Sequence, residues 1–166
     1  MTDSAPHVVS PAALRELMVN LLAAAGCPDE AAQPTAEVLY EADLRGYGTH
    51  GLLRLPNMIH RVRSGMIDPD GRPRVVQERE GTALVDGGLS LGPVGAVFGA
   101  EVAIRKAKSA GCCAVGVVNS NHICLAGYYA ERVARAGYVG IITTVTTPLA
   151  HVLGGFERLL GTNPLA

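Results

Sequence analysis

The polar cluster around His122 is the part of this sequence whose residue types most directly suggest chemistry. Residues 113–118 are small, apolar and partly β-branched, which predicts a short buried strand. The sequence turns polar at Asn119, so His122 should follow the carboxyl end of that strand, where α/β proteins often place functional groups. An imidazole with an ordinary pKa of about 6.5 can exchange protons near neutral pH. His122 is therefore a candidate acid–base group, with a loop residue of no chemical role as the alternative.

A second histidine is expected in a glycine-rich turn. Three glycines between residues 46 and 51 end a predicted helix and let the backbone turn sharply. This turn would present Thr49 and His50. Arg54 follows four residues after His50, about one helical turn away if the next helix begins early. Taken alone, Arg54 could also be a charged residue on a solvated helix face.

The four cysteines, Cys27, Cys112, Cys113 and Cys124, match no disulfide framework. Because no secretory signal precedes them, free thiols in the cytoplasm are expected. Three of them could form a metal site with His122, but CxxC or HxxxH spacing is absent, so we predict no metal. Cys124 lies two residues after His122 and could act as a nucleophile, although no orienting Asn or Asp and no oxyanion arrangement is evident.

Composition excludes several classes of protein. The chain has 166 residues, of which 48% are hydrophobic and 17% charged, and this balance predicts one ordered domain of ordinary size. The net charge of −1 provides no basic surface for nucleic acid or an anionic membrane. No apolar run approaches the ~18 residues that would span a bilayer. We therefore expect a cytoplasmic protein that binds neither nucleic acid nor a membrane.

Periodicity and turn residues predict an α/β fold. N-terminal helices should be followed by strands that alternate with helices from about residue 82, with some parallel pairing. We expect a helical region with a short strand over residues 1–80 and an α/β region over residues 81–166. The loop Gly92–Gly95 matches a dinucleotide fingerprint only superficially, so a Rossmann site is not supported. The expected elements are a tail over 1–9, helices over 10–26, 29–45, 52–63, 93–110 and 126–136, and strands over 74–78, 82–86, 113–118 and 138–144.

Five segments together resemble the malate/L-lactate dehydrogenase family of the second type, a non-Rossmann group. This group also contains ureidoglycolate and sulfolactate dehydrogenases. The segments come in the family's order and extend along nearly the whole chain. They are ADLRGYGTHG (42–51), RLPNMIHRVRSGMI (54–67), ALVDG (83–87), VNSNHICLAGYYAERVARAGYVGI (118–141) and GGFERLLGTNPLA (154–166).

The resemblance implies an oxidoreductase that transfers hydride between NAD or NADP and a 2-hydroxy or 2-oxo acid. His122 and His50 both match active-site histidines of the family, and the sequence does not decide which one transfers the proton. Arg54 matches an arginine associated with substrate, whose guanidinium can hold a carboxylate through two parallel hydrogen bonds. Thr49 and Ser120 could orient the histidines or contact substrate. The cofactor is expected near Thr146, Gly161, Thr162 and Asn163.

The sequence departs from the family pattern at several positions. Thr49 replaces a common Ser and keeps the hydroxyl, whereas Met58 replaces a Tyr found on the substrate side. Ile123 and Cys124 replace a common Phe-Gly, which should alter the pocket and leaves the preferred acid undefined. Family members also continue beyond this ending, so residues 81–166 should be incomplete without a C-terminal portion.

Two functions follow from the resemblance. The first is the N-terminal part of a dehydrogenase that forms homo-oligomers. The second is an inactive truncated remnant, or a subunit that dimerises without turnover. The isolated chain is expected to be inactive in either case.

Overall fold

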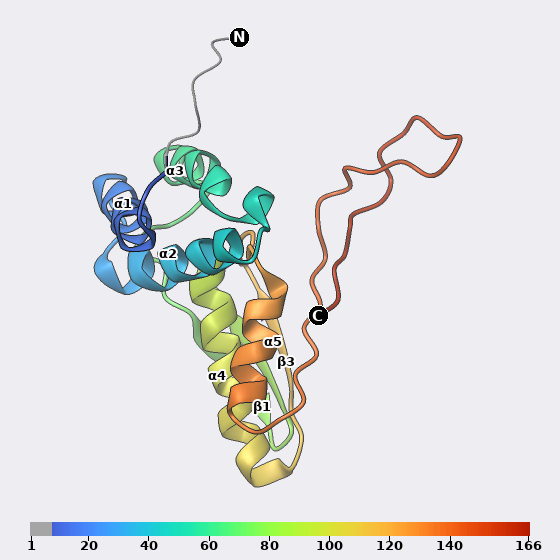
Figure 1. The fold of residues 1–166 in the computed structure, drawn as a ribbon. Helices are drawn as coiled ribbons and strands as arrows, with labels where there is room; N and C mark the ends of the chain where they lie inside the picture. The colour runs from blue at the N-terminus through green and yellow to red at the C-terminus, as the bar shows by residue number, and fades with distance from the viewer. Residues whose placement is uncertain (1–7) are drawn as a thin grey trace.

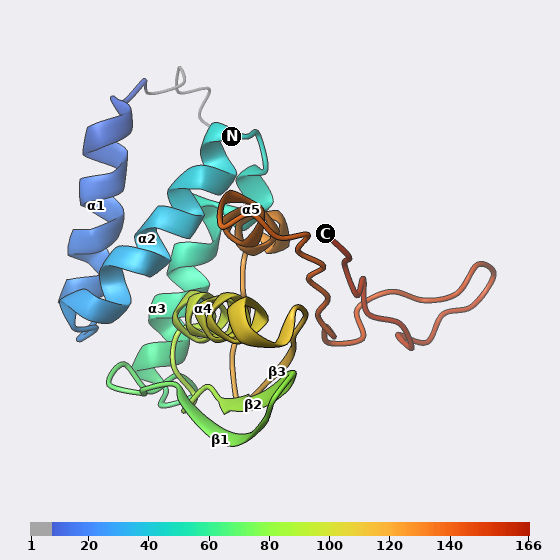
Figure 2. The same cartoon turned by 90° about the horizontal axis from the view of Figure 1, so that it is seen from below.

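The computed structural model describes residues 8–166, so the expected N-terminal tail lies outside the described residues except at its last two positions. The mixed α/β fold agrees with the predicted class. Three helices form one part of the molecule, and a three-stranded sheet with two further helices forms the other (Figures 1 and 2). A C-terminal arm of residues 138–166 has neither helix nor strand. Its first residues still pack against the rest of the molecule at Gly140 and Ile142, and the remainder extends away from both parts.

The helical part contains α1 (Pro11–Ala24), α2 (Asp29–Leu44) and α3 (Leu55–Arg63). Ser10 caps α1, because its Oγ accepts a hydrogen bond from the N–H of Ala13 at 3.2 Å. Helix α2 begins at Asp29 and continues through Pro34, so the proline does not delay its start. Apolar residues of these helices form most of the larger core, including Met18, Leu22, Leu39 and Leu55.

The sheet contains β1 (Arg74–Arg79), β2 (Thr82–Asp86) and β3 (Ala114–Val118) in that order. Strands β1 and β2 form an antiparallel hairpin across the expected boundary between residues 80 and 81, and β2 pairs with β3 in parallel. Helix α4 (Gly92–Ala110) makes the crossover between these parallel strands and covers one face of the sheet (Figure 2). Helix α5 (Ala126–Arg135) follows β3 and packs beside α4.

Strand β3 forms where a strand was expected, but the prediction that it is buried was wrong. Most of its residues are exposed, including Val117 and Val118. The physical reason is its position, because β3 is an edge strand and packs against α4 on only one face. The central strand β2 carries the buried side chains, Ala83 and Val85.

The strand expected over residues 138–144 does not form. Val139 and Ile141 are 92% and 73% exposed in the arm. Two isolated antiparallel bridges, Thr143 with Leu165 and Ala150 with Leu160, hold the two sides of the arm together. The apolar run has β-propensity, but a strand also needs a neighbour to satisfy its backbone. Within residues 8–166, the only other segment to which the backbone of residues 139–144 bonds is the short stretch 164–166.

No helix between residues 8 and 166 is long and apolar enough to cross a membrane.

Candidate active site

The two candidate histidines lie next to each other. Their ring centroids are 5.7 Å apart, and the ring planes are tilted by 35°. His50 ends a short 3₁₀ turn, η1 (Gly48–His50), which follows α2. His122 lies in the loop between β3 and α5. The fold therefore brings two imidazoles from distant parts of the sequence close enough to belong to one site.

The turn that carries His50 is held by Asp43 near the end of α2. A carboxylate oxygen of Asp43 accepts the backbone N–H of Leu52 at 2.8 Å. The Asp43 carboxylate also packs against the Cα of Gly51, where any side chain would overlap it. Glycine is thus required at position 51 because the Asp43 carboxylate approaches its backbone closely. The chain continues from there into the second 3₁₀ turn, η2 (Leu52–Arg54).

Two contacts order the side chains around His50. The hydroxyl of Thr49 lies 3.0 Å from Nδ1 of His50, and either atom can be the donor. The Nε of Arg54 donates to the carbonyl oxygen of Thr49 at 2.7 Å. This leaves the two terminal nitrogens of the Arg54 guanidinium available to a ligand. His50 and Arg54 are both half-buried.

The loop that carries His122 packs tightly against the start of α4. The carbonyl oxygens of Asn121 and His122 lie so close to Gly92 that a side chain there would overlap them. The hydroxyl of Ser120 occupies the space beside Gly95. The glycines at positions 92 and 95, which resembled a nucleotide fingerprint, therefore let a helix approach the histidine loop.

Asn121 anchors the same loop, a role that the sequence did not reveal. Its side-chain N–H₂ donates to the carbonyl oxygens of Leu89 and Ser90 at 3.0 and 2.9 Å. Its side-chain oxygen accepts from a terminal nitrogen of Arg61 on α3 at 2.9 Å. The only signal in the sequence was a polar residue after a strand, and this does not specify partners from two distant segments.

A backbone donor holds the imidazole of His122. The N–H of Cys124 donates to Nδ1 of His122 at 3.0 Å. Nδ1 must therefore carry a lone pair, so the neutral ring has its proton at Nε2. Ser120 makes no such contact, since its buried hydroxyl has no hydrogen-bond partner within residues 8–166.

Burial and positive charge keep both imidazoles neutral. Desolvation of the ring, followed by the charges of Arg54, His50 and Arg61, lowers the pKa of His122 to about 4, although one side of the residue stays exposed. Desolvation and then Arg54 lower the pKa of His50. At pH 7 the site therefore contains two uncharged rings beside the cationic Arg54.

The thiol of Cys124 is poorly suited to nucleophilic chemistry. Its side chain is 6% exposed, and burial raises its pKa to about 12. It is the backbone N–H of Cys124, and not the sulfur, that faces the His122 ring. All four cysteines are free. No three His, Cys, Asp or Glu side chains within residues 8–166 gather in a way that could hold a metal ion.

The four residues expected at the cofactor gather on the arm. The side-chain oxygen of Asn163 accepts the N–H of Thr146 at 3.0 Å, and the hydroxyls of Thr146 and Thr162 lie 3.4 Å apart. Gly161 packs so closely on Thr146 that a side chain would overlap it. The structure thus brings these four together, on an arm that extends away from the helices and the sheet (Figures 1 and 2).

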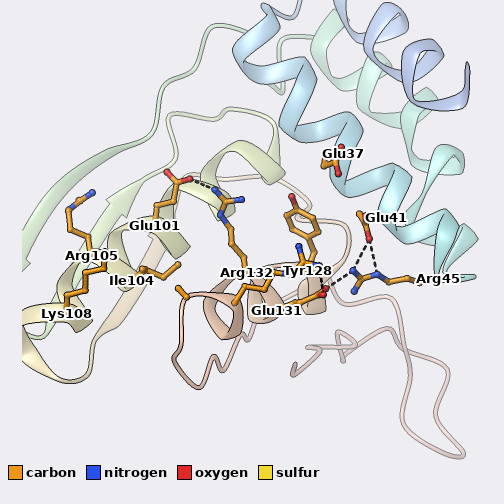
Figure 3. Close-up of a pocket in the computed structure, with 12 residues that line it drawn as sticks. Glu37, Glu41, Arg45, Glu101, Ile104, Arg105, Lys108, Tyr128, Glu131 and Arg132 are labelled. Atoms are coloured by element: carbon orange, nitrogen blue, oxygen red, sulfur yellow. Dashed lines mark hydrogen bonds and ion pairs between the residues drawn. The ribbon is translucent and has the colours of Figure 1, made fainter. Parts of the chain in front are cut away.

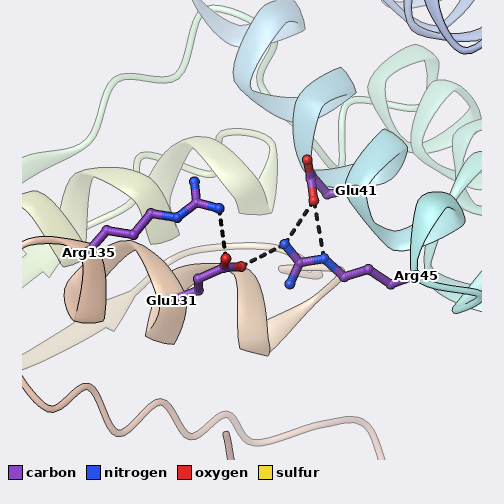
Figure 4. A network of polar contacts seen from close by, with 4 residues as sticks. All are labelled: Glu41, Arg45, Glu131 and Arg135. Atoms are coloured by element: carbon purple, nitrogen blue, oxygen red, sulfur yellow. Dashed lines mark hydrogen bonds and ion pairs between the residues drawn. The ribbon is translucent and has the colours of Figure 1, made fainter.

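An ion-pair network connects the end of α2, which leads to His50, with α5, which follows His122. Arg45, just before the His50 turn, contacts Glu41 on α2 and Glu131 on α5, at 2.8 and 2.6 Å. Glu131 also pairs with Arg135 at 2.7 Å (Figure 4). Helix α5 begins directly after the His122 loop, so the network ties the supports of both loops together.

One pocket lies at this network and not at the histidines. It has a volume of about 630 Å³ and is lined by residues of α2, α4 and α5 (Figure 3). Most of its acidic side chains pair with its basic ones, as Glu101 does with Arg132 and Glu131 with Arg45. Paired charges leave little net field for a charged ligand, so we do not assign the active site to this pocket.

Comparison with known proteins gives a consistent family. The family model described as malate/L-lactate dehydrogenase matches residues 9–166. L-sulfolactate dehydrogenase of Methanocaldococcus jannaschii is 39% identical over 159 residues, covering 96% of this chain and 46% of the relative. Ureidoglycolate dehydrogenase (NAD(+)) of Escherichia coli is 34% identical over 158 residues, covering 95% of this chain and 45% of the relative.

A solved structure agrees with these relatives. Malate dehydrogenase from Pyrococcus horikoshii superimposes with a TM-score of 0.90 at 40% identity, covering 95% of this chain and 45% of the other. The chain therefore spans less than half the length of each of these three proteins.

Proposed function

The chain belongs to the malate/L-lactate dehydrogenase family, and from this premise we propose that it forms the N-terminal part of a 2-hydroxy acid dehydrogenase. The reaction would transfer hydride between NAD or NADP and a 2-hydroxy or 2-oxo acid. The observation that carries the proposal is the pair of neutral imidazoles, 5.7 Å apart, beside Arg54. Such a site can exchange a proton with a hydroxyl group while it holds a carboxylate.

His50 is the residue that we assign to proton transfer. Oxidation of an alcohol releases the hydroxyl proton to a base as the hydride leaves carbon. The Thr49 hydroxyl can accept from Nδ1–H of His50 and thereby leave a lone pair on Nε2. After Nε2 takes the proton, Nδ1–H keeps the same partner. The contact thus suits both the neutral and the protonated ring.

His122 has a different proposed role. Because its Nδ1 accepts the N–H of Cys124, only Nε2–H can face a ligand. If Nδ1 were protonated, its N–H would point at the N–H of Cys124, and two donors cannot bond to each other. This agrees with a pKa of about 4 for His122. A neutral imidazole can still donate a hydrogen bond from Nε2 to the substrate oxygen and stabilise negative charge there as the ketone is reduced.

Arg54 is proposed to hold the substrate carboxylate. Its Nε is occupied by the carbonyl oxygen of Thr49, which fixes the orientation of the guanidinium plane. The two terminal nitrogens can then form parallel hydrogen bonds to a carboxylate. The substrate class is accordingly an acid whose hydroxyl or keto carbon is next to the carboxylate.

The cofactor would be held in part by the hydroxyls and amide of Thr146, Thr162 and Asn163. A side chain at position 161 would overlap Thr146 and Asn163, so Gly161 lets these polar residues stay close together. When bound, the nicotinamide supplies a hydride acceptor or donor. The free thiols fit a reducing compartment, and we propose a cytoplasmic protein that forms homo-oligomers.

A fusion enzyme provides the test. Residues 1–166 would replace the matching N-terminal portion of the Methanocaldococcus jannaschii sulfolactate dehydrogenase. We expect this fusion enzyme to reduce NAD or NADP with at least one acid in a panel of 2-hydroxy acids. A folded fusion enzyme that binds cofactor but oxidises no acid, while the parent relative is active in the same assay, would contradict the proposal.

The second candidate function, an inactive association subunit, is favoured by the apolar side chains of the arm. Val139, Val145 and Phe156 are all at least 90% exposed, and β3 leaves one edge unpaired within residues 8–166. Such surfaces promote association. We expect the isolated chain to be oligomeric or aggregation-prone and to show no turnover. Sedimentation, cofactor calorimetry and the acid panel test this, and a monomer that turns over would contradict it.

A further inference from the structure

One peptide group links a buried tyrosine to His122. Tyr129 on α5 is 1% exposed, and its hydroxyl donates to the carbonyl oxygen of Ile123 at 2.6 Å. The N–H on the other side of the same peptide bond is that of Cys124, which donates to Nδ1 of His122 at 3.0 Å. Because a peptide group is planar and rigid, a partner that fixes its oxygen also fixes the direction of its N–H.

The backbone at this point needs such support. Cys124 has a φ of +61°, a left-handed conformation that non-glycine residues rarely adopt. A conformation of this kind persists only where the surroundings hold it. The buried side chain of Cys124 provides one hold, and the Tyr129 hydroxyl on the adjoining carbonyl provides another. A donor on the carbonyl also polarises the amide and strengthens its N–H as a donor.

We propose that Tyr129 is a positioning residue that, through the Ile123–Cys124 peptide, fixes the His122 imidazole in the tautomer with its proton at Nε2. Tyr129 does not touch the reacting atoms in this scheme. It determines which ring nitrogen of His122 can face a ligand. The link is read directly from the two hydrogen bonds, whereas its consequence for catalysis rests on the proposed function.

Titratable and charged groups from three other segments act in the same direction. Arg54 from η2, His50 from η1 and Arg61 from α3 all disfavour a positive charge on His122. These groups oppose protonation at either nitrogen, so they keep the ring neutral without choosing a tautomer. The choice between Nδ1–H and Nε2–H is left to the Cys124 N–H, which makes the tautomer a specific signature of the Tyr129 link.

The test is NMR of the full chain with ¹⁵N-labelled histidine, with the His122 signals assigned by comparison with the His122→Gln variant. The two ring-nitrogen shifts report the tautomer directly. In the wild-type chain, His122 should be neutral at pH 7 with its proton at Nε2. In Tyr129→Phe, the population of the Nδ1–H tautomer of His122 should increase. The pKa of His122 should rise by about 0.5–1 pH unit, which corresponds to the weakening of one neutral hydrogen bond to the uncharged ring.

Tyr128→Phe is the matched control, because Tyr128 is the adjacent tyrosine of α5 and its hydroxyl does not bond to Ile123. It should leave both the tautomer and the pKa of His122 unchanged. A folded Tyr129→Phe chain with an unchanged tautomer and pKa would overturn the proposal. If that variant fails to fold, the wild-type chain decides: a His122 ring protonated at Nδ1 at pH 7 overturns the proposal, and Nε2–H supports it.

These readouts require no turnover, so they separate the positioning role from the proposed dehydrogenase activity. An inactive fusion enzyme together with the predicted tautomer would contradict the dehydrogenase and leave the Tyr129 link in place. An active fusion enzyme in which the His122 tautomer does not depend on Tyr129 would support the dehydrogenase and contradict the Tyr129 link.

Discussion

His50 and His122 are neighbours of the same residue type, yet the chain holds them in different ways. The Nδ1 of His50 faces the Thr49 hydroxyl, which can rotate to donate or to accept. The Nδ1 of His122 faces a backbone N–H, which can only donate. The comparison shows that the partner of Nδ1 determines whether Nε2, on the other side of the ring, can accept a proton or can only donate a hydrogen bond. One ring can exchange a proton, while the other can only offer one in a hydrogen bond.

Glutamine substitutions should distinguish the roles of the two histidines most clearly, through their different effects on activity. A glutamine amide can donate a hydrogen bond but cannot exchange a proton. In the fusion enzyme, His50→Gln should lower kcat by about 10²–10⁴-fold, as expected for loss of an acid–base group, and His50→Ala should be no worse. His122→Gln should keep more activity than His122→Ala, because a donor remains.

The control is His60→Ala, which alters an exposed histidine of α3 and should leave kcat near the wild-type value. If His50→Gln stays active while both His122 variants lose activity, the two roles are assigned the wrong way round.

Arg54→Lys should separate substrate binding from proton transfer. Lysine keeps the charge but lacks the planar pair of donors and the Nε–H that bonds the Thr49 carbonyl. We expect the KM for the acid to rise by about tenfold in the fusion enzyme, from loss of a charge-assisted hydrogen bond. The urea midpoint of unfolding should change little. An unchanged KM would show that Arg54 has a structural role.

The pH dependence of stability should sharpen the comparison through His122. The unfolded chain binds a proton at an ordinary histidine pKa near 6.5, whereas folded His122 binds it only near pH 4. Between these values the unfolded state holds more protons, so the free energy of unfolding should fall as the pH is lowered from about 6.5 to 4. Above pH 7, His122 should contribute little to the slope.

His122→Gln should therefore flatten the decline of the urea midpoint between pH 7 and pH 5. His50, whose pKa is also lowered, should contribute in the same direction and leave a residual slope. An identical decline in the wild-type chain and in His122→Gln would mean that His122 is not kept neutral by folding.

Thr49 substitutions should produce the smallest effect. Thr49→Val is nearly isosteric but removes the hydroxyl that faces Nδ1 of His50. Because Thr49 is exposed, the loss should be near the low end for a hydrogen bond, about two- to fivefold in kcat. Thr49→Ser restores the hydroxyl and should recover the activity. Equal rates in the serine and valine variants would show that the hydroxyl does not orient His50.

The sequence predicted the elements well where local signals were strong. The Ser10–Pro11 start and the glycine stops define the ends of the helices, and β1 and β2 show clear strand patterns. It failed where tertiary neighbours decide the outcome. Residues 114–118 and 138–144 are both rich in apolar side chains, yet one segment became an exposed edge strand and the other part of the arm. Apolar character indicates that a segment needs cover, but not whether a neighbour is present to provide it.

The site shows the same limit. The residue types and the glycine turns identified His50 and His122 as candidates, and the fold brings them together. Their hydrogen-bond partners were not evident, because the Cys124 amide has no side-chain signature and Tyr129 reads as an ordinary apolar helix residue. Backbone partners are set by local φ and ψ, as the left-handed Cys124 illustrates, and single residue types rarely reveal them.

The projecting arm makes this chain a natural substrate for proteases. Exposed chain without helix or strand is cleaved in preference to packed elements, and Arg158 and Phe156 are exposed there. Brief digestion should remove much of the arm and leave a resistant body that contains His50, His122 and Arg54. The cut would detach the residues proposed for the cofactor from those proposed for the substrate. The proposed catalytic groups and the proposed nucleotide contacts would thus be physically separable in this molecule.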